Sequence, residues 1–461
     1  MTLRLAARPL LAALHAAVLL ALAGPAAAQP AAPGRSLPDR IDRLLQEHRL
    51  MRVVAADVAS ADAAIGAEQS AYYPRVSLSM TAGRQKIDRD IGTTGSFNPR
   101  EQSVSVNQLI SDFGATGDRV RTARLVADKE RREQELQRQN LLLAAVEAQL
   151  ALIRASQVVK FARRSEDYVQ RQTQLENTRL EAGRGYATDV LQAKAQLAGV
   201  QARRIAAERQ WQEAVNRYEA VFGERPATAE DLEALAAPAA LLPASEEAVL
   251  DEHWLGGNPD LIAAQARAQV AHAERDQQRS RELAPRVDLQ VSRSRYDELD
   301  GVLGRRDDTR AQVRLSWSFD VGMRAARVTD AADQAAISAD EKAGYVRIQA
   351  MEELRNAWTG WRTARERSAY LNDQVALSGK FLDLGRRERE LGRRTLLDLL
   401  SGETGLLNAQ SDAIAARIDE VVAAYRVMRA GGKLTPALFR EPGIVVPGSD
   451  LTGDAPAAAA H

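Results

Sequence analysis

The sequence predicts a duplicated α/β chain in which two pairs of short strands are joined to very long antiparallel helices of the coiled-coil type. Two long stretches without proline predict the helices, and segments of alternating apolar and polar residues predict the strands. Motifs that recur after about 210 residues indicate that one structural unit occurs twice.

The first 28 residues have the features of a removable signal peptide. Arg4 and Arg8 precede an apolar run at residues 10–23, and small residues follow at 26–28. A short apolar core with such a cleavage motif is typical of an export signal rather than of a membrane anchor. In the mature chain we expect no apolar stretch of the ~20 residues that a helical membrane span requires. The mature chain is therefore either soluble in the periplasm or crosses the outer membrane as β-strands.

The composition argues against several classes of function. The chain has 62 basic and 62 acidic residues, which makes nucleic acid a poor candidate partner. It has no cysteine, which excludes disulfides and thiolate metal sites. Its five histidines are scattered, with no pair at metal-ligand spacing. No cluster of ionisable residues suggests a catalytic site, so we expect neither a metal or other cofactor nor enzymatic activity.

Two long helical regions are predicted from the distribution of proline and glycine. No proline occurs between Pro99 and Pro226 or between Pro285 and Pro436, and glycine is absent from residues 118–182. Proline costs about 3 kcal/mol inside a helix, and roughly 65 residues at 1.5 Å each would make a rod of ~100 Å. Apolar residues form narrow stripes between charged ones in this stretch, as in helix-on-helix packing.

Three motifs recur in the same order. Pro74-Arg75-Val76 recurs as Pro285-Arg286-Val287, Asp112-Phe113-Gly114 as Asp320-Val321-Gly322, and Gly183 with Asp189 as Gly392 with Asp398. We therefore divide the chain into a signal peptide at 1–28, two homologous units at 39–225 and 250–435, a linker at 226–249 and a flexible tail at 436–461.

Each unit contains two candidate strands, which should have one apolar and one polar face. The apolar positions are Val76, Leu78 and Met80, then Val104 and Val106, in the first unit, and Val287, Leu289 and Val291, then Val313, Leu315, Trp317 and Phe319, in the second. Loops are expected between the strands, at residues 85–102 and 295–310. The pairs are either half-buried hairpins on a soluble core or parts of a membrane barrel. Asp288 and Arg314 on the polar face favour the barrel, because a packed core rarely accepts charges.

Closure of such a barrel requires more than one chain. Four strands cannot enclose a lumen, and open strand edges are not tolerated in lipid. Three copies would supply twelve strands, an even number large enough for a water-filled channel. The strands therefore predict a homotrimer in contact with outer-membrane lipid.

Each unit also has a hinge between two helices, at residues 183–191 and 392–400. The glycine that opens each hinge ends the incoming helix by taking a left-handed conformation. Thr395 and Asp398 have the spacing of a capping box, and Asp189 lies in a first turn, where negative charge is favourable. Both aspartates are thus accounted for as helix starts, and a gating role is the alternative.

The duplicated Pro-x-Val strand starts, the Asp-x-Gly strand exits and the two Gly-x5-Asp hairpins together resemble the TolC-like outer-membrane efflux and secretion channel family. The resemblance covers residues 39–435. It implies a homotrimer with a twelve-stranded β-barrel in the outer membrane and an α-helical tunnel in the periplasm. It also implies a mixed equatorial region, built here from residues 224–250 and from the chain after 430.

The resemblance implies further that the hairpin tips form a closed tunnel mouth. Gly183 and Gly392 would contact a periplasmic adaptor protein, the membrane fusion protein of the system. Asp398 of each protomer would contribute to an acidic ring at the narrowest point. Ser401 stands where the best-known member has a second aspartate, so this mouth would have one acidic ring.

Candidate gating residues also follow from the resemblance. Arg394 matches a basic latch residue, and Thr188 and Asp189 match its partners on the neighbouring hairpin. Arg389 stands where the best-known member has an aromatic hydroxyl. An ion pair between Asp189 and Arg389 that replaces this hydrogen bond is a hypothesis.

The implied function is that of a passive exit duct, which carries cargo from an inner-membrane pump and its adaptor to the exterior. Type I protein secretion with an ABC transporter is the favoured cargo class, because many dedicated multidrug ducts carry a lipidated cysteine that this chain lacks. Small-molecule or multidrug efflux with an RND pump is the alternative. A periplasmic coiled-coil structural protein without a barrel is the alternative of a different class, but it leaves the amphipathic strands unexplained.

Overall fold

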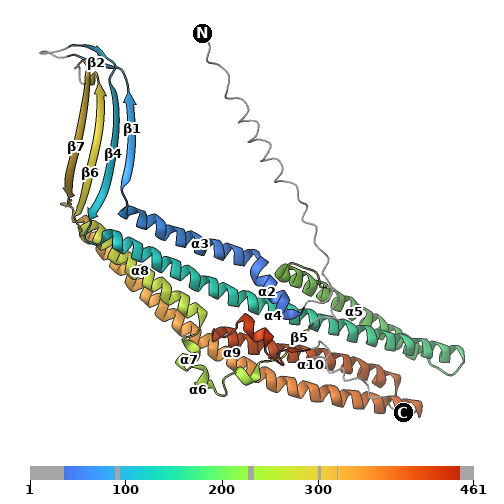
Figure 1. Ribbon diagram of the computed structural model, residues 1–461. Coiled ribbons are helices and arrows are strands. Elements are labelled where there is room, and N and C mark those ends of the chain that lie inside the picture. Colours follow the sequence, from blue (N-terminus) through green and yellow to red (C-terminus); the bar gives the residue numbers. More distant parts are fainter. Residues whose placement is uncertain (1–35, 89–93, 227–232, 300–302, 319, 447–461) are drawn as a thin grey trace, which may run out of the picture.

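The computed structural model describes residues 36–88, 94–226, 233–299, 303–318 and 320–446 and has an elongated, bent shape (Figure 1). A narrow sheet stands at one end, and long helices run away from it. The predicted combination of strand pairs and very long helices is confirmed. The signal peptide predicted at 1–28 lies outside the described residues.

The two halves contain the same elements in the same order. In the first half these are α3 (Arg49–Gln69), β1 (Arg75–Ala82), β4 (Arg100–Ser111), α4 (Ala115–Glu181) and α5 (Ala187–Phe222). In the second half they are α8 (Pro259–Leu283), β6 (Arg286–Asp297), β7 (Arg305–Ser316), α9 (Arg324–Glu390) and α10 (Leu396–Ala430). Helices α4 and α9 both have 67 residues, and both lie within the stretches without proline.

The Asp-x-Gly motif forms the turn from a strand to a long helix in both halves. In the first half, the carboxylate of Asp112 accepts a hydrogen bond of 2.8 Å from the backbone N–H of Thr116, in the first turn of α4. Gly114 between them has a φ of 103°, a conformation that glycine adopts without strain. In the second half, Asp320 accepts a bond of 2.8 Å from the N–H of Gly322. The motif thus forms the turn before each long helix, and in the first half its aspartate also caps the helix.

The four long strands form one antiparallel sheet in the order β1-β4-β6-β7, so the halves join where β4 pairs with β6. Val76 pairs with Val106, which in turn pairs with Val291. Because side chains alternate between faces, all the predicted apolar positions inside the strands share one face. Trp317 lies just beyond β7 and donates from Nε1 to the carbonyl of Leu283 at 3.2 Å. Phe319 lies outside the described residues.

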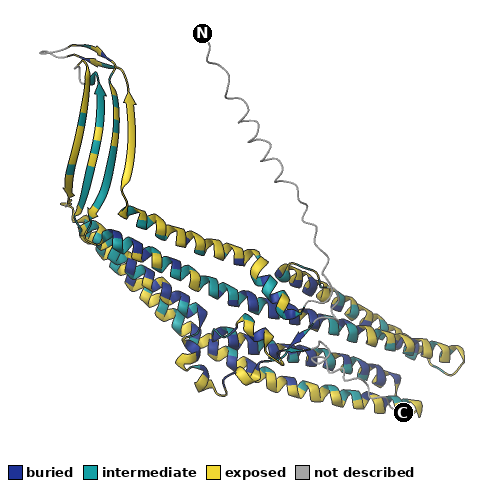
Figure 2. Ribbon diagram, in the orientation of Figure 1, coloured by how far each residue is buried: buried dark blue, intermediate teal, exposed yellow. Residues whose placement is uncertain are grey.

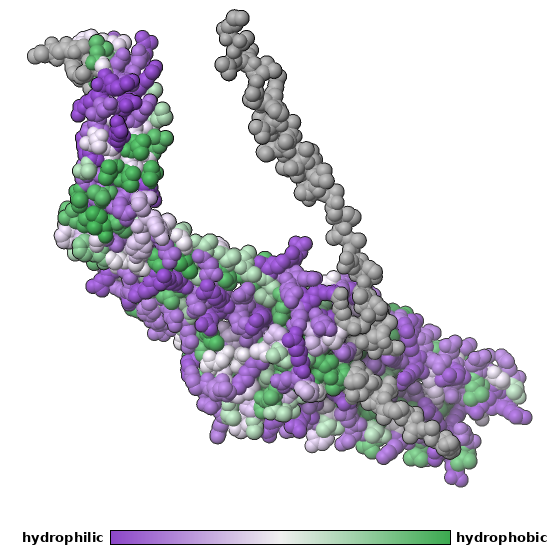
Figure 3. Space-filling model, viewed as in Figure 1, coloured by the Kyte–Doolittle hydropathy of each residue, from purple (hydrophilic) through white to green (hydrophobic). Residues whose placement is uncertain are grey.

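The apolar face is exposed to an unusual degree. Side chains that are each 65–71 % exposed include Val76, Leu78, Met80, Val313 and Leu315. Figure 3 shows hydrophobic side chains gathered on the half of the sheet nearest the helices, with hydrophilic side chains beyond them. The sheet therefore presents an uncovered apolar band that ends in a charged region.

The loop predicted at residues 295–310 is shorter than expected. β6 continues to Asp297 and β7 already begins at Arg305. Opposite charges face each other across these strand ends: Arg295 Nε lies 2.8 Å from Asp307 Oδ1, and Arg305 Nε lies 3.2 Å from Asp297 Oδ1. Cross-strand pairs of opposite charge stabilise a sheet, so a charged segment here is strand and not loop.

The loop predicted at residues 85–102 also contains regular structure. β2 (Gln85–Ile87) and β3 (Gly95–Phe97) form a small antiparallel sheet, and β4 begins at Arg100. Ile87 and Phe97 are buried in this segment. Two apolar side chains within a polar stretch account for the extra pairing.

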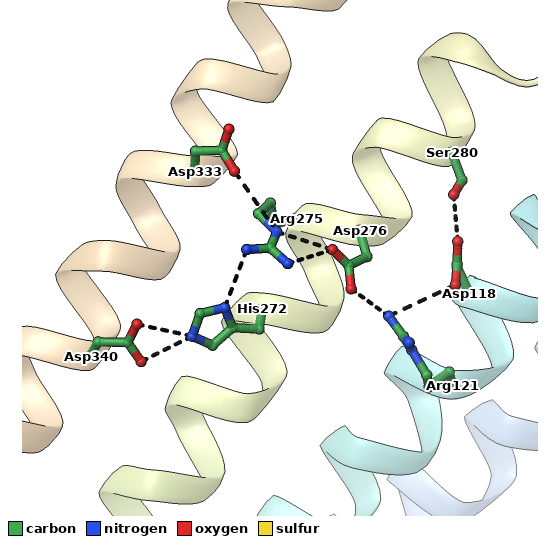
Figure 4. A network of polar contacts seen from close by, with 8 residues as sticks. All are labelled: Asp118, Arg121, His272, Arg275, Asp276, Ser280, Asp333 and Asp340. Carbon is green, nitrogen blue, oxygen red and sulfur yellow. Dashed lines mark hydrogen bonds and ion pairs between the residues drawn. The ribbon is translucent and has the colours of Figure 1, made fainter.

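Next to the sheet, α8 packs between α4 and α9, and a network of polar contacts joins the three helices (Figure 4). Its contacts are Arg121–Asp276 at 2.6 Å, Arg275–Asp276 at 2.7 Å, Arg275–Asp333 at 3.8 Å, His272–Asp340 at 2.9 Å and a hydrogen bond from Ser280 to Asp118. Partial burial disfavours the charge on Asp276, but hydrogen bonds from Arg275 and Arg121 outweigh it and lower its pKa. Most side chains that α8 buries are alanines, so these polar contacts add specific ties to a small apolar interface.

The main hydrophobic core lies midway along the helical body, where α2 (Leu37–Glu47) meets α4, α5, α9 and α10 (Figure 2). Here β5 (Ala234–Leu235) pairs with β8 (Val445–Val446), as a mixed equatorial region implies. The link between the halves adds η2 (Ala239–Leu241), α6 (Glu246–Val249) and α7 (Glu252–Leu255). The segments that connect and end the repeats therefore close the core.

The expectation of a flexible tail from residue 436 is wrong for its first part. η4 (Pro436–Arg440) buries Leu438 and Phe439, and the Phe439 ring lies parallel to that of Tyr425 with centroids 6.0 Å apart. These side chains are ordered because they fill the equatorial core. Residues 447–461 lie outside the described part of the chain.

Helix α4 corrects the expectation that no segment is apolar enough to span a membrane as a helix. Among the described residues it is the one helix that contains such a stretch, an 18-residue window with a mean hydropathy of 1.4. However, 56 % of that window is buried inside the protein. The stretch therefore forms the core of the helical body.

We predict that Gly432→Ala destabilises the protein by more than about 2 kcal/mol, because two local constraints require glycine. Gly432 has a φ of 67°, and an added Cβ would lie 1.8 Å from the carbonyl oxygen of Gly257. Gly199→Ala in α5 is the matched control, since nothing lies within 4 Å of its added Cβ. Thermal unfolding of the detergent-solubilised variants measures both effects. Equal midpoints for Gly432→Ala and wild type would contradict the packing described.

Candidate functional site at the helical hairpins

Both helical hairpins turn in the same way at their tips. Gly183 and Gly392 follow α4 and α9 with φ values of 70° and 72°. In the first hairpin, the N–H of Arg184 donates to the carbonyl of Arg179 at 2.9 Å, and that of Gly183 donates to Leu180 at 2.9 Å. The second hairpin repeats this pair of bonds, which defines a Schellman motif. The predicted glycine stop is therefore confirmed twice.

The outgoing helices begin differently in the two hairpins. In α10, Thr395 Oγ1 accepts a hydrogen bond of 3.2 Å from the backbone N–H of Asp398, which confirms the capping role of the threonine. In α5, Tyr186 occupies the capping position and makes no side-chain cap. Asp189 and Asp398 both lie in first turns, so each carboxylate is close to the positive end of a helix dipole.

Three of the predicted mouth residues line one groove on the second hairpin. Arg394, Asp398 and Ser401 contribute to a hollow of about 590 Å³ between α9 and α10, together with Phe381. The Arg394 guanidinium lies 4.7 Å from the centre of the Phe381 ring, and its Nε lies 3.2 Å from Glu388. Asp398 is exposed. The structure thus brings the predicted acid and the predicted latch residue onto one surface.

The hypothesis of an ion pair between Asp189 and Arg389 is wrong within one chain. Arg389 Nη2 lies 3.0 Å from Glu176 Oε1, and Arg389 Nη1 donates to the carbonyl of Arg394 at 3.1 Å. Glu176 is only 2 % exposed and also binds Arg179 at 2.8 Å. Arg389 reaches Glu176 because that acid lies on the buried stripe of α4. Thr188 and Asp189 belong to the first hairpin, and Asp189 makes no ion pair among the described residues.

Glu176 was missed by the sequence analysis, although a signal for it exists. Val169, Thr173 and Glu176 follow each other at spacings of about one turn and are all buried. An acidic residue at the next position of a buried stripe must find a cation, because an unpaired buried charge is costly. The period of the stripe would therefore have identified Glu176.

A second missed contact links the same helices further from the tip. The Arg386 guanidinium lies 4.8 Å from the centre of the Tyr168 ring in α4, and its Nη2 lies 3.3 Å from Glu403 Oε2 in α10. Glu403 is only 9 % exposed. Burial raises the pKa of its carboxyl, although the charge and hydrogen bond of Arg386 act in the opposite direction.

Apolar packing joins the two hairpins beside these charges. The small cluster consists of Val169, Ala193, Val200, Leu396 and Leu400. Through this cluster the first turn of α10 packs against α4 and α5. Beside it, Gln196 Nε2 donates a hydrogen bond of 2.5 Å to Thr404 Oγ1. The beginning of α10, which bears Asp398, is therefore held by the first hairpin as well as by α9. Among the described residues, no group of three or more His, Asp or Glu is placed to hold a metal ion.

Comparisons with known proteins agree with this architecture. Residues 40–224 and 252–433 match the family profile described as "Outer membrane efflux protein". The chain is 26 % identical over 425 residues to the outer membrane efflux protein BepC of Brucella suis, which covers 91 % of this chain and 90 % of BepC. It is also 26 % identical over 409 residues to the alkaline protease secretion protein AprF of Pseudomonas aeruginosa, covering 84 % and 82 % of the two chains.

Solved structures show the same fold at lower sequence identity. The outer membrane protein VceC of Vibrio cholerae has a TM-score of 0.72 at 18 % identity and covers 86 % of this chain and 95 % of its own. The CmeC outer membrane channel of Campylobacter jejuni has a TM-score of 0.73 at 14 % identity, covering 86 % and 85 %.

We predict that Glu403→Gln slows amide hydrogen exchange across residues 396–407 roughly fivefold at pH 8. The variant avoids a cost of ~1 kcal/mol for burying a carboxylate. The raised pKa means that the folded protein holds this proton at pH values where the unfolded chain, with a glutamate pKa of about 4.3, has lost it. The contribution of the protonated Glu403 carboxyl to stability is therefore complete at low pH and is lost as the pH rises. Near pH 4 the variant and wild type should exchange alike.

Asp412→Asn is the matched control, since Asp412 is an exposed acid on the same helix. It should leave exchange unchanged at both pH values. Faster exchange in Glu403→Gln at pH 8 would show that the ion pair with Arg386 outweighs the cost of burying the carboxylate.

Proposed function

This chain belongs to the outer membrane efflux protein family, and we propose that three copies of it form the exit duct of a tripartite export system. As a member of that family it is an outer-membrane protein, with its helical body in the periplasm. The proposed duct acts as a passive conduit without chemistry of its own. An inner-membrane pump would supply the energy, and an adaptor in the periplasm would connect the pump to the hairpin tips.

The observation that carries this proposal is the exposed, two-faced sheet. One face bears uncovered side chains such as Leu78 and Val313, which water solvates poorly and lipid solvates well. The other face is polar along all four strands, as a water-filled lumen requires. The outer strands of this sheet, β1 and β7, each have one partner within the described chain, so further copies are needed to close a barrel.

Protein secretion is the cargo class that we propose first. The similarity to AprF, a protein named for alkaline protease secretion, supports it, and so does the absence of a cysteine that could be lipidated. An ABC transporter is then the proposed pump. The second candidate is small-molecule efflux with an RND pump, which the similarity to the efflux protein BepC favours. Deletion of the gene separates the two: secretion predicts a protein missing from the culture medium, and efflux predicts sensitivity to small toxic compounds.

We predict that Leu78→Arg prevents assembly, because an arginine on the lipid-facing side costs about 2–4 kcal/mol near the membrane centre. Ser77→Arg is the matched control, since the neighbouring residue on the same strand faces the polar side. The measurement is the yield of heat-modifiable trimer in outer-membrane fractions. Equal yields for the two variants, or wild-type protein in the soluble periplasmic fraction, would contradict the proposed barrel.

We predict that the adaptor crosslinks to cysteines placed at the hairpin tips. Arg184 and Arg393 are suitable positions because they are exposed and directly follow Gly183 and Gly392, whose positive φ disfavours a side chain. The natural chain has no cysteine, so each variant carries a single reactive thiol. Ala55→Cys on α3, far from the tips, is the control. Capture of the same partner from Ala55→Cys would argue against docking at the tips.

A further inference from the structure

The polar face of the sheet carries an excess of positive charge. The register places five arginines and three acidic residues on this face: Arg75, Arg286, Arg306, Arg310 and Arg314 against Glu101, Asp288 and Asp308. Five positive and three negative charges leave two positive charges per chain. The opposite face carries an equal excess, but only in the half of the strands away from the helices, from Arg100, Arg293, Arg295 and Arg305 against Asp297 and Asp307.

The arginines gather where the sheet meets the helices. A hollow of about 610 Å³ there is lined by Arg75, Arg119, Arg286 and Arg314, which we call the arginine collar, and by the single acid Asp288. Arg75 begins β1, Arg286 begins β6, and Arg119 lies in the second turn of α4. The turns that connect strands to helices therefore bring residues from both halves of the chain together in the arginine collar.

Internal pairing neutralises only part of the collar. Arg286 Nε lies 2.8 Å from Asp288, and Arg119 Nε lies 3.6 Å from Glu68 outside the hollow. Arg314 makes a neutral contact, donating to Gln290 Oε1 at 3.1 Å. Arg75 is exposed and makes no ion pair among the described residues. Two of the four guanidinium groups thus keep their charge available to a ligand.

Nearby acids do not cancel this charge. Asp112 lies within electrostatic reach of Arg286, but its carboxylate caps α4 through Thr116. Four arginines against Asp288, Glu68 and Asp112 still leave one positive charge per chain. In the proposed trimer three such collars face one water-filled lumen, so an ion that passes through it meets the positive charge of all three.

We propose that the arginine collar binds anionic groups of the cargo in transit and makes the barrel end of the duct selective for anions. The inference rests on the proposed trimeric duct, since only three collars around one lumen make a ring. Guanidinium groups bind carboxylates and phosphates through paired hydrogen bonds, and rings of arginine favour anions in pores. The cargo is therefore expected to present carboxylate or phosphate groups as it leaves the tunnel.

The collar acts independently of the acidic mouth. Asp398 lies at the opposite end of α9 from β7, and a helix of 67 residues is roughly 100 Å long. That distance is many screening lengths, so the carboxylate ring cannot neutralise the collar. A charged blocker added at the barrel side meets the collar without passing the mouth.

The test uses the full trimer in planar bilayers, with Arg75→Gln/Arg314→Gln as the variant. In a salt gradient we expect the ratio of chloride to potassium permeability to fall at least twofold in this variant. Tripolyphosphate added at the barrel side should block the wild type, and the concentration for half block should rise at least tenfold in the variant. A hexaglutamate peptide tests binding of carboxylates in the same experiment, and block by either probe supports the proposed role of the collar.

Two further variants keep the result interpretable. Arg293→Gln on the opposite face of β6 is the matched control and should leave both readouts unchanged. Arg75→Lys/Arg314→Lys retains the charge and should restore most of the chloride preference. Unchanged selectivity and block in the glutamine variant, or an equal effect of Arg293→Gln, would overturn the inference while the channel itself remained. A wild-type protein without any conductance would instead contradict the proposed duct, and the collar would fall with it.

Discussion

A strand in hydrocarbon must pair both of its edges, because no water is present to bind its N–H and C=O groups. The sheet of this chain ends in β1 on one side and β7 on the other, and its apolar face has no cover. One chain cannot meet either requirement by itself. In the proposed duct, further copies of the chain pair these edges, and the enclosed lumen and the inward direction of the polar side chains follow from this single constraint. Charges on the polar face then line an enclosed lumen, where they act on every ion that passes.

The helices transmit the geometry of the sheet to the periplasm. α4 starts directly after β4, and α9 starts shortly after β7, each at an Asp-x-Gly turn. α8 holds these two helices together through alanine packing and the polar network around Arg275. At the other end, the ion pair of Glu176 with Arg389 joins the two hairpins, and that of Glu403 with Arg386 joins the two helices of the second hairpin. Such pairs stabilise little in total, since desolvation offsets their attraction, but a buried acid requires a cation beside it and so favours one arrangement of the helices.

Local sequence signals were sufficient for most of the fold. Alternation located the strands, the absence of proline located α4 and α9, and Gly183 and Gly392 located the turns. The errors arose where distant residues decide the outcome. The strand ends at Asp297 and Arg305 depend on register, which the sequence of one strand does not contain. Arg389 and Glu176 are 213 residues apart, and the order around Phe439 depends on a core formed by five helices.

The equal lengths of the duplicated helices restrict which insertions and deletions this chain can accept during evolution. α4 and α9 have 67 residues each, and α5 and α10 have 36 and 35, so both hairpin tips end at about the same distance from the sheet. Insertion of one residue would shift a tip by 1.5 Å and rotate its apolar stripe by about 100°. Only insertions or deletions of whole seven-residue helical repeats, made in all four helices together, preserve the packing and keep the two tips at equal height. Substitutions are therefore the open route for adapting the tips to a new partner, while the length of the rods stays fixed.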